Sequence, residues 1–277
     1  MKKKIEKAEV LIEALPYIKR FYGKYVVIKY GGAAMVDEKL KDSFATDCTL
    51  LKFVGIKPVI VHGGGPKINE LMKKVGRQIR FVEGLRVTSE EDMEYVEMVL
   101  CRINSDIVSL LNKHSAKAIG LSGVDSSMIQ AIPIEGMGFV GDVAEIHIEP
   151  IKLLDEAGFV PVIAPIGVDK EGRRYNINAD TVAANVAVAL QAEKLILLTD
   201  TKGICDGETL LSTLKSDEIE PLIEKGCISG GMIPKAKASR NAVSYGVKKA
   251  HIIDGRILHS ILLELFTDEG IGTQIVA

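Results

Sequence analysis

Short apolar runs alternate with amphipathic stretches along most of this chain, and this alternation limits the possible folds more than any other feature. The runs are rich in Val, Ile and Leu and are only five or six residues long, as is typical of buried strands. We expect strands at residues 25–29, 58–62, 117–121, 159–164, 194–199 and 250–254. Helical patterns cover 37–54, 66–75, 89–111 and 182–190 between them. The alternation predicts an α/β fold with a mainly parallel sheet.

Two segments break the alternation. Residues 128–148 are typical of β-hairpins, with a turn at 135–138, and a second turn is expected at 169–172. A domain boundary is expected near Asn178. The first 22 residues form a separate helical unit, which Pro16 should kink. That helix either covers the chain's own core or docks on another subunit.

Composition excludes several classes of function. The chain has 277 residues and a net charge of −2, so no basic surface argues for nucleic acid as a partner. The four cysteines lie far apart without CxxC spacing, which favours reduced, mostly buried thiols over disulfides or a zinc site. No run approaches the ~20 apolar residues of a membrane helix, and the basic start lacks the apolar segment of a signal peptide. We therefore expect a cytoplasmic protein without a membrane partner.

Three glycine clusters stand at the junctions between predicted strands and helices. They lie at residues 31–32, 63–65 and 230–231. Loops of this kind let backbone N–H groups approach an anion, and the N-terminus of the following helix adds a favourable dipole. A single cluster would be explained by tight packing alone, but three clusters together indicate phosphate binding.

Familiar nucleotide motifs do not explain these glycines. No GxxxxGK[ST] sequence occurs, which excludes a P-loop enzyme. Ile68 stands where a dinucleotide-binding fingerprint needs Gly or Ala, and the GxSxG elbow of the α/β hydrolases is absent.

A few charged residues beside the glycines suit phosphoryl transfer, which depends on positioning and on positive charge. Lys29 and Lys235 each adjoin a glycine cluster. Asp180 is either the N-cap of a helix or a carboxylate that holds both lysines in place. Arg86 either grips a substrate carboxylate or is simply solvated. The five histidines show no metal-ligand spacing, so we assign none of them to catalysis and expect no metal site of the protein's own.

Taken together, these motifs resemble the amino acid kinase family and, within it, the acetylglutamate kinases. The resemblance spans nearly the whole chain. It is carried by VIKYGGAAM (27–35), IVHGGGPKI (60–68), GLRVT (84–88), NINADT (176–181), LILLTDTKG (195–203), GGMIPK (230–235) and EGIGT (269–273).

The resemblance implies a three-layer αβα sandwich of the carbamate kinase-like type with two lobes. Residues 1–22 would form an N-terminal helix for oligomerisation and regulation, 23–178 the lobe that binds the amino-acid substrate under a β-hairpin lid, and 179–277 the ATP-binding lobe. The stretch 132–138 is shorter than usual for the family, and Val124 replaces a residue that is often polar, so the lid is expected to differ.

The implied reaction is phosphorylation of the γ-carboxylate of N-acetyl-L-glutamate by ATP, a step of arginine biosynthesis. The substrate carboxylate is the nucleophile, so no general base is needed. Mg²⁺ would be held mainly by the ATP phosphates and water, without a tightly bound cofactor. The implied catalytic residues are Lys29, Lys235, Asp180, Gly32 and Gly64. The implied substrate-binding residues are Gly64, Gly65, Arg86 and Asn176, and the implied ATP-binding residues are Lys29, Gly31, Gly32, Thr199, Asp200, Gly231 and Lys235.

The N-terminal helix resembles that of family members that form hexamers, built as trimers of dimers, and are inhibited by L-arginine. The resemblance places arginine near this helix and residues 259–272, with Tyr17, His259, Glu264 and Glu269 as candidate contacts. A PII-type signalling protein regulates some relatives, and the sequence leaves that partner open.

Two alternative functions remain open at this point. The first is a kinase of the same family that acts on an aminoadipate derivative, aspartate, glutamate, carbamate or UMP. The second is a non-catalytic sensor of arginine or nucleotide. A sensor of that kind would be expected to have lost Lys29, Lys235 or Asp180, and all three are present.

Overall fold

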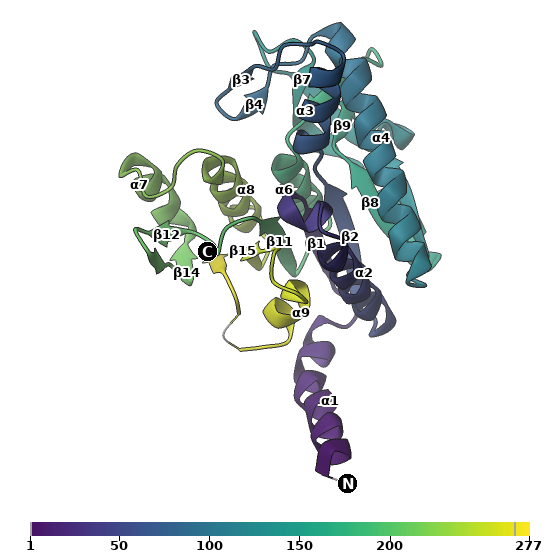
Figure 1. Ribbon diagram of the computed structural model, residues 1–277, viewed down its shortest axis with the longest axis vertical. Helices are drawn as coiled ribbons and strands as arrows, with labels where there is room; N and C mark the ends of the chain where they lie inside the picture. Colours follow the sequence, from purple (N-terminus) through teal and green to yellow (C-terminus); the bar gives the residue numbers. More distant parts are fainter. Residues whose placement is uncertain (1, 269) are drawn as a thin grey trace.

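An eight-stranded sheet forms the centre of the computed structural model, which describes residues 2–268 and 270–277 (Figure 1). Its strands lie in the order β14-β16-β15-β11-β1-β2-β8-β5. Their bounds are β1 Tyr25–Tyr30, β2 Lys57–His62, β5 Ala118–Ser122, β8 Val160–Ala164, β11 Lys194–Thr199, β14 Thr213–Lys215, β15 Lys249–Asp254 and β16 Thr273–Val276. The strands from β15 through β5 run parallel, and β16 is antiparallel to β15. The expected mainly parallel sheet is confirmed.

Helices cover both faces of the sheet. Their bounds are α2 Glu38–Phe53, α3 Gly65–Lys74, α4 Glu90–Lys113, α5 Glu149–Glu156, α6 Ala179–Ala189, α7 Ile219–Glu224, α8 Met232–Ser244 and α9 Ser260–Leu265, with short 3₁₀ turns at Gly32–Met35, Asp125–Ser127 and Ser216–Glu218. Alternate residues of β1 face opposite layers, as the two-residue period of a strand requires. Ile28 packs in one cluster with residues of α2 and α4, whereas Val27 packs in another with residues of α6 and α8. The fold is therefore a three-layer αβα sandwich.

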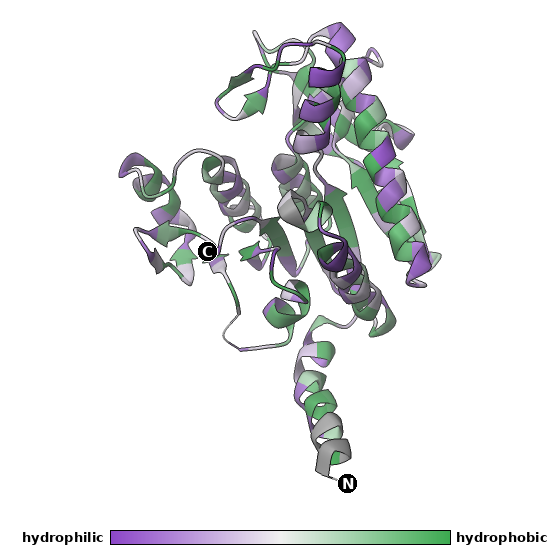
Figure 2. Ribbon diagram, viewed as in Figure 1, coloured by the Kyte–Doolittle hydropathy of each residue, from purple (hydrophilic) through white to green (hydrophobic). Residues whose placement is uncertain are grey.

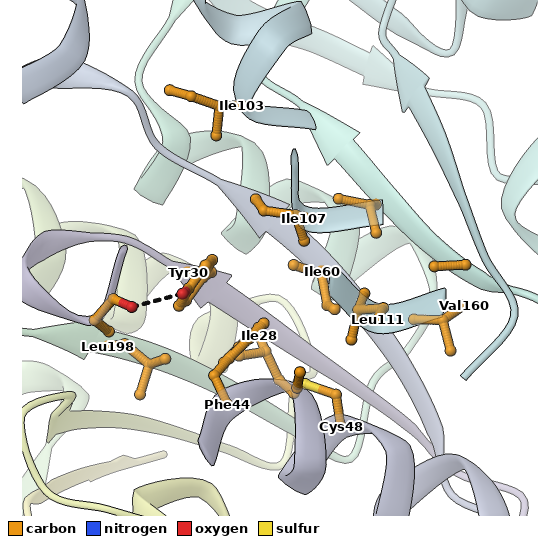
Figure 3. Packing of buried hydrophobic residues seen from close by; sticks show 14 of the residues in the cluster. Ile28, Tyr30, Phe44, Cys48, Ile60, Ile103, Ile107, Leu111, Val160 and Leu198 are labelled. Carbon is orange, nitrogen blue, oxygen red and sulfur yellow. Dashed lines mark hydrogen bonds between the residues drawn. The ribbon is translucent and has the colours of Figure 1, made fainter. Parts of the chain in front are cut away.

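The buried cluster between the sheet and helices α2 and α4 consists mainly of aliphatic side chains (Figure 3). Tyr30 stacks on Phe44 with 3.7 Å between ring centroids, and its hydroxyl donates to the Ala34 carbonyl oxygen at 2.6 Å. This hydrogen bond satisfies the one polar atom of a fully buried ring at the end of β1. It also ties the loop after β1, which carries two glycines, to the core.

The segments that break the alternation form smaller sheets. Strands β6 Ile129–Pro133, β7 Val140–Ile146, β9 Ile166–Val168 and β10 Arg174–Ile177 make a small closed barrel, while β3 Phe81–Val82 with β4 Leu85–Arg86 and β12 Cys205–Asp206 with β13 Thr209–Leu210 make two-stranded ribbons. The expected hairpin at 128–148 is the antiparallel pair β6–β7. The expected turn at 169–172 joins β9 to β10, where Asp169 accepts backbone N–H groups of Glu171 and Arg173.

Helix α1 Lys2–Phe21 projects from the body of the molecule and contains Pro16 (Figure 1). Its apolar side chains Val10, Leu11 and Ile12 are 63%, 73% and 67% exposed, whereas Phe21 in the last turn is buried. The alternative that this helix covers the chain's own core is therefore wrong for all but its last turns.

The distribution of hydropathy follows the layers, with the strands of the large sheet predominantly hydrophobic (Figure 2). Among the described residues, no helix combines the length and the apolar character needed to cross a bilayer. The four cysteines are free, but only Cys48 is buried and Cys101 is exposed. The expectation of mostly buried thiols was wrong, because Cys101 lies on the exposed side of α4, Cys205 in the short strand β12 and Cys227 in a loop.

Candidate active site

A carboxylate held between two lysines lies at the carboxyl edge of the large sheet, next to the end of β1. Asp180 Oδ1 lies 3.3 Å from Lys29 Nζ, and Asp180 Oδ2 lies 2.6 Å from Lys235 Nζ. The three residues come from β1 and the first turns of α6 and α8. Asp180 and Lys29 are only 4% and 8% exposed. The structure therefore brings together three residues that are up to 206 positions apart (235 − 29) in the chain.

Burial and charge compete in this triplet. Burial alone would raise the pKa of the Asp180 carboxyl, but the two ammonium groups outweigh it and hold that pKa below its ordinary value. Burial lowers the pKa of Lys29, and Asp180 opposes this change. Asp180 thus stays ionised at neutral pH and fixes both lysine side chains before any ligand arrives.

Asn178 decides between the two interpretations of Asp180. Its side-chain oxygen accepts the backbone N–H groups of Asp180 and Thr181, so Asn178 is the N-cap of α6. The helix end therefore needs no cap from Asp180, whose carboxylate is available to the lysines. The interpretation of Asp180 as a simple N-cap is wrong.

The first glycine cluster, Gly31 and Gly32, lets the backbone lie close to the side chains of Lys29 and Asp200. A Cβ atom on Gly31 would lie 2.5 Å from Lys29 Nζ, a distance at which one of the two must move. Gly32 has φ +69°, and a Cβ atom there would lie 2.3 Å from Asp200 Oδ1. Side chains at these two positions would displace the charged groups around the end of β1.

The second glycine cluster and α3 border a cavity of about 190 Å³ beside Lys29 and Asp180. At Gly64, a Cβ atom would lie 2.7 Å from Leu100 Cδ2, so the backbone of this loop sits directly on α4. The cavity is lined by Lys29, Gly63, Gly64, Gly65, Ile68, Phe81, Gly84, Leu85, Arg86, Leu100, Val140, Pro165, Asn176, Ile177, Asn178, Ala179 and Asp180. Four residues named from the sequence as substrate contacts, Gly64, Gly65, Arg86 and Asn176, thus share one cavity with two of the charged triplet.

Arg86 is built into the wall of this cavity rather than solvated. Its Nη2 donates to Asn69 Oδ1 at 2.5 Å and to the Gly65 carbonyl oxygen at 3.3 Å, and its guanidinium lies 4.8 Å from the centre of the Phe81 ring. Its Nη1 is buried and has no hydrogen-bond partner among the residues that the structure describes. A buried guanidinium with an unused edge is suited to a carboxylate. Asn69 and Phe81 were not predicted as part of the site, because neither belongs to a glycine motif or a charged motif in the sequence.

The remaining residues assigned to ATP from the sequence lie outside this cavity. Thr199 ends β11, and its carbonyl oxygen accepts the N–H of Gly255 at 2.8 Å. Asp200 lies beside Gly32, and Gly231 is the N-cap residue directly before α8.

A second cavity of about 300 Å³ lies between the end of α1 and α9. It is lined by Tyr17, Arg20, Phe21, Lys194, Ser212, Thr213, Lys249, His251, Glu264, Leu265, Thr267, Asp268, Gly270, Gly272 and Gln274. The Tyr17 hydroxyl donates to Asp268 Oδ1 at 2.5 Å, and Glu264 Oε1 lies 2.5 Å from His251 Nδ1.

Two candidates for the arginine site, Tyr17 and Glu264, therefore share this second cavity. His259 lies elsewhere, because its Nδ1 binds Asp47 at 2.7 Å and so joins α9 to α2. Glu269 is outside the described residues. The histidine that does line the cavity is His251, which sequence analysis did not select because it lies inside an apolar strand.

Comparisons with known proteins agree with this geometry. The model of the amino acid kinase family matches residues 24–254. Acetylglutamate kinase from Syntrophomonas wolfei subsp. wolfei is 52% identical over an alignment of 280 residues that covers 98% of each chain. Acetylglutamate kinase from Geotalea daltonii is 54% identical over 292 residues, covering the whole of both chains.

A solved structure provides a comparison of the fold. N-acetylglutamate synthase from Neisseria gonorrhoeae, complexed with coenzyme A and N-acetyl-glutamate, matches with a TM-score of 0.87 at 29% identity. The match covers 98% of this chain and 63% of that longer one. Family model, full-length relatives and fold all agree, and the chain belongs to the amino acid kinase family and, within it, to the acetylglutamate kinases.

Proposed function

We infer that this protein transfers the γ-phosphoryl group of ATP to the γ-carboxylate of N-acetyl-L-glutamate, giving N-acetyl-L-glutamyl 5-phosphate and ADP, a step of arginine biosynthesis. The observation that carries this inference is the Lys29–Asp180–Lys235 triplet at the edge of a cavity that also holds Arg86. The relatives at 52% and 54% identity are acetylglutamate kinases over their full length.

The geometry explains how such a transfer proceeds without a general base. A side-chain carboxyl group of ordinary pKa, about 4.3, is ionised at neutral pH and is itself the nucleophile. Negative charge spreads over the transferring oxygens in the transition state, and preorganised cations and N–H groups stabilise that charge. Lys29 and Lys235 supply the cations, and we assign the N–H groups to Gly32 and Gly64.

Asp180 holds the two lysines in place before the reaction, so no free energy is needed to position them during the transfer. Without a carboxylate between them, two ammonium groups in a buried site would repel each other and would turn toward water. Arg86 and Asn176, with the backbone of Gly64 and Gly65, would hold the acetylated amino acid. Arg86 supplies the charge-assisted contact with the α-carboxylate.

ATP is the co-substrate of the kinase family, and we propose that it binds on the α8 side of the triplet, near Gly31, Thr199, Asp200 and Gly231. Both oxygens of Asp180 face lysine ammonium groups, so we assign this carboxylate to positioning the lysines. Mg²⁺ would arrive with ATP, held by phosphates and water, as suits a cation that gives up water reluctantly. On this proposal, residues 23–178 form the substrate lobe and residues 179–277 the ATP lobe.

We further propose that L-arginine inhibits the enzyme from the second cavity. Glu264 and Asp268 offer carboxylates for a guanidinium, and Lys194 and Lys249 offer ammonium groups for an α-carboxylate. The exposed apolar side of α1, which also carries Tyr17 to this cavity, supports assembly through that helix into a hexamer. A cytoplasmic location and a PII-type regulator stay predictions from the sequence.

The test is acyl phosphate formation, trapped as the hydroxamate by hydroxylamine. The purified protein is given MgATP with N-acetyl-L-glutamate, glutamate, aspartate or N-acetylaminoadipate, each with and without arginine. Hydroxamate only with N-acetyl-L-glutamate is the expected result, with suppression by arginine. Product with another acceptor alone would refute the substrate, and full activity at saturating arginine would refute the regulation.

A further inference from the structure

His62 ends β2 directly before the glycine loop, and sequence reasoning gave it no role. Its side chain is completely buried, at 0% exposure. Its ring Nδ1 lies 3.0 Å from the Gly63 carbonyl oxygen, and its Nε2 lies 3.2 Å from Asn104 Nδ2 on α4. Both ring nitrogens of a buried histidine are therefore engaged, one with the glycine loop and one with a helix.

The orientation of the Asn104 amide is fixed independently of His62. Asn104 Nδ2 also lies 2.9 Å from the Val162 carbonyl oxygen and 3.4 Å from the Leu121 carbonyl oxygen. A carbonyl oxygen only accepts hydrogen bonds, so the group facing both carbonyls must be the amide NH₂. An amide nitrogen does not accept hydrogen bonds, so in the 3.2 Å contact with His62 Nε2 the donor must be Asn104.

This orientation determines the tautomer of His62. Since Asn104 donates, His62 Nε2 must accept, and the ring proton is on Nδ1. Nδ1–H then donates to the Gly63 carbonyl oxygen. The pKa of His62 is lowered from 6.5 to about 4, chiefly by burial, with the Gly63 carbonyl opposing this change and the charge of Lys29 adding to it. The ring is neutral at physiological pH and is not itself a proton carrier.

The hydrogen bond has a geometric consequence for the next residue. The Gly63 carbonyl and the Gly64 N–H belong to one planar trans peptide, so they point in opposite directions. The Gly63 N–H is also held, since it donates to the Tyr30 carbonyl oxygen at 2.9 Å. Fixing the Gly63 carbonyl toward His62 thus fixes the Gly64 N–H away from it, on the loop that lines the cavity beside Lys29.

We propose that His62 and Asn104 are positioning residues that hold the Gly63–Gly64 peptide so that the Gly64 N–H faces the transferring phosphoryl group. The proposal rests on the proposed kinase function. Glycine at residues 63 and 64 leaves this peptide free to rotate, and a rotated peptide would turn a carbonyl oxygen toward the phosphate. The buried histidine removes that freedom before ATP binds.

Two matched substitutions distinguish the hydrogen bond made by Nδ1 from the contact made by Nε2. In His62→Asn, the side-chain amide takes the place of Nδ1 and can still donate to the Gly63 carbonyl. In His62→Gln, the longer amide takes the place of Nε2, so it can meet Asn104 but leaves the Gly63 carbonyl without its donor. Both variants put a neutral amide into the same buried position, and their thermal stability is compared first.

The expected result is a kcat for His62→Asn within about fivefold of wild type and a fall of about 100-fold for His62→Gln, as when one preorganised donor is lost. The KM for N-acetyl-L-glutamate should change less than kcat in both, because Arg86, Asn176 and Gly65 still hold the acceptor while the lost contact to the phosphoryl group acts in the transition state. Equal losses in both variants, or a more active His62→Gln, would show that the ring only fills space and would overturn the proposal.

A second measurement does not depend on activity or on the variants. Neutron diffraction from deuterated wild-type crystals places the ring deuteron of His62 directly. A deuteron on Nδ1, directed at the Gly63 carbonyl oxygen, is the expected result, and one on Nε2 overturns the proposal even if neither variant folds. Absence of hydroxamate from the wild-type protein with every acceptor would instead contradict the proposed function, so the two failures are distinguishable.

Discussion

Gly31→Ala tests whether the position of the Lys29 ammonium controls the rate. A Cβ atom at residue 31 would lie 2.5 Å from Lys29 Nζ and 3.1 Å from its Cε. An ordinary non-bonded contact is ~3.5 Å, so the ammonium must move by about 1 Å. The φ angle of Gly31 is not in the left-handed region, so the backbone itself accommodates alanine.

A displacement of about 1 Å in a catalytic group lowers the rate by on the order of 100-fold, or about 2.7 kcal/mol of transition-state stabilisation. The movement also disturbs the 3.3 Å contact between Lys29 and Asp180. We therefore expect kcat in the hydroxamate assay to fall by about 100-fold, with KM for N-acetyl-L-glutamate changed by less than about threefold.

Gly63→Ala is the matched comparison, because its Cβ atom would meet the same lysine at ordinary contact distances, 3.7 Å to Cε and 3.8 Å to Nζ. It should lower kcat by less than about tenfold, since Lys29 need not move. Gly31→Ala with more than a third of the wild-type kcat would refute the argument. Equal losses in the two variants would refute it as well, since the effect would then reflect lost loop flexibility.

The other predictions concern different parts of the site. Lys235→Ala should lower kcat by about 100–1,000-fold with less than a tenfold change in KM for ATP, and a pure KM effect in steady-state kinetics would contradict its role. Arg86→Gln should raise KM for N-acetyl-L-glutamate by about 10–100-fold, whereas Arg86→Lys, which keeps the charge, should raise it less; equal effects would argue against a directed contact. The pKa of His62 is lowered from 6.5 to about 4 in the folded protein, so between these pH values the unfolded state binds a proton that the folded state does not. The contribution of neutral His62 to the free energy of unfolding is therefore complete above pH 6.5 and is lost as pH falls toward 4. Urea unfolding at pH 7 and pH 5 should show a loss of about 2 kcal/mol in wild type that is missing in His62→Asn, and identical losses would contradict the assignment. Glu264→Gln should raise the arginine concentration for half-inhibition by about tenfold or more, and unchanged inhibition would move the regulatory site elsewhere.

The sequence predicted the elements well where burial alone determines them. The strand at residues 194–199 was predicted at its observed bounds, because its side chains are buried on both faces and form a continuous apolar run. Helix α4 was placed within two residues, because Ser89 is a true N-cap. The order of the strands was not predicted, since no local pattern records which strands are neighbours.

The candidate site was predicted where motifs carry it and missed where the tertiary fold creates it. Lys29 and Lys235 stand out beside glycines in the sequence, and Asp180 stands out in the polar motif at residues 176–181. His251 could not be recognised in the sequence, because it lies inside an apolar strand and its partner Glu264 comes from a different element of the fold. His259 followed from the resemblance alone, and the structure places it with Asp47 instead of the second cavity.

Helix α1 has a consequence for how the protein behaves at different concentrations. Its outer turns expose Val10, Leu11 and Ile12 to water, while one residue of its inner half, Tyr17, reaches the second cavity. If L-arginine binds in the second cavity, as proposed, a second subunit that shields the outer turns would also restrain Tyr17 at that site. By mass action, dilution would remove that restraint. Inhibition curves for arginine measured at nanomolar and micromolar enzyme concentrations should then differ. Inhibition would depend on the concentration of the protein as well as on that of arginine.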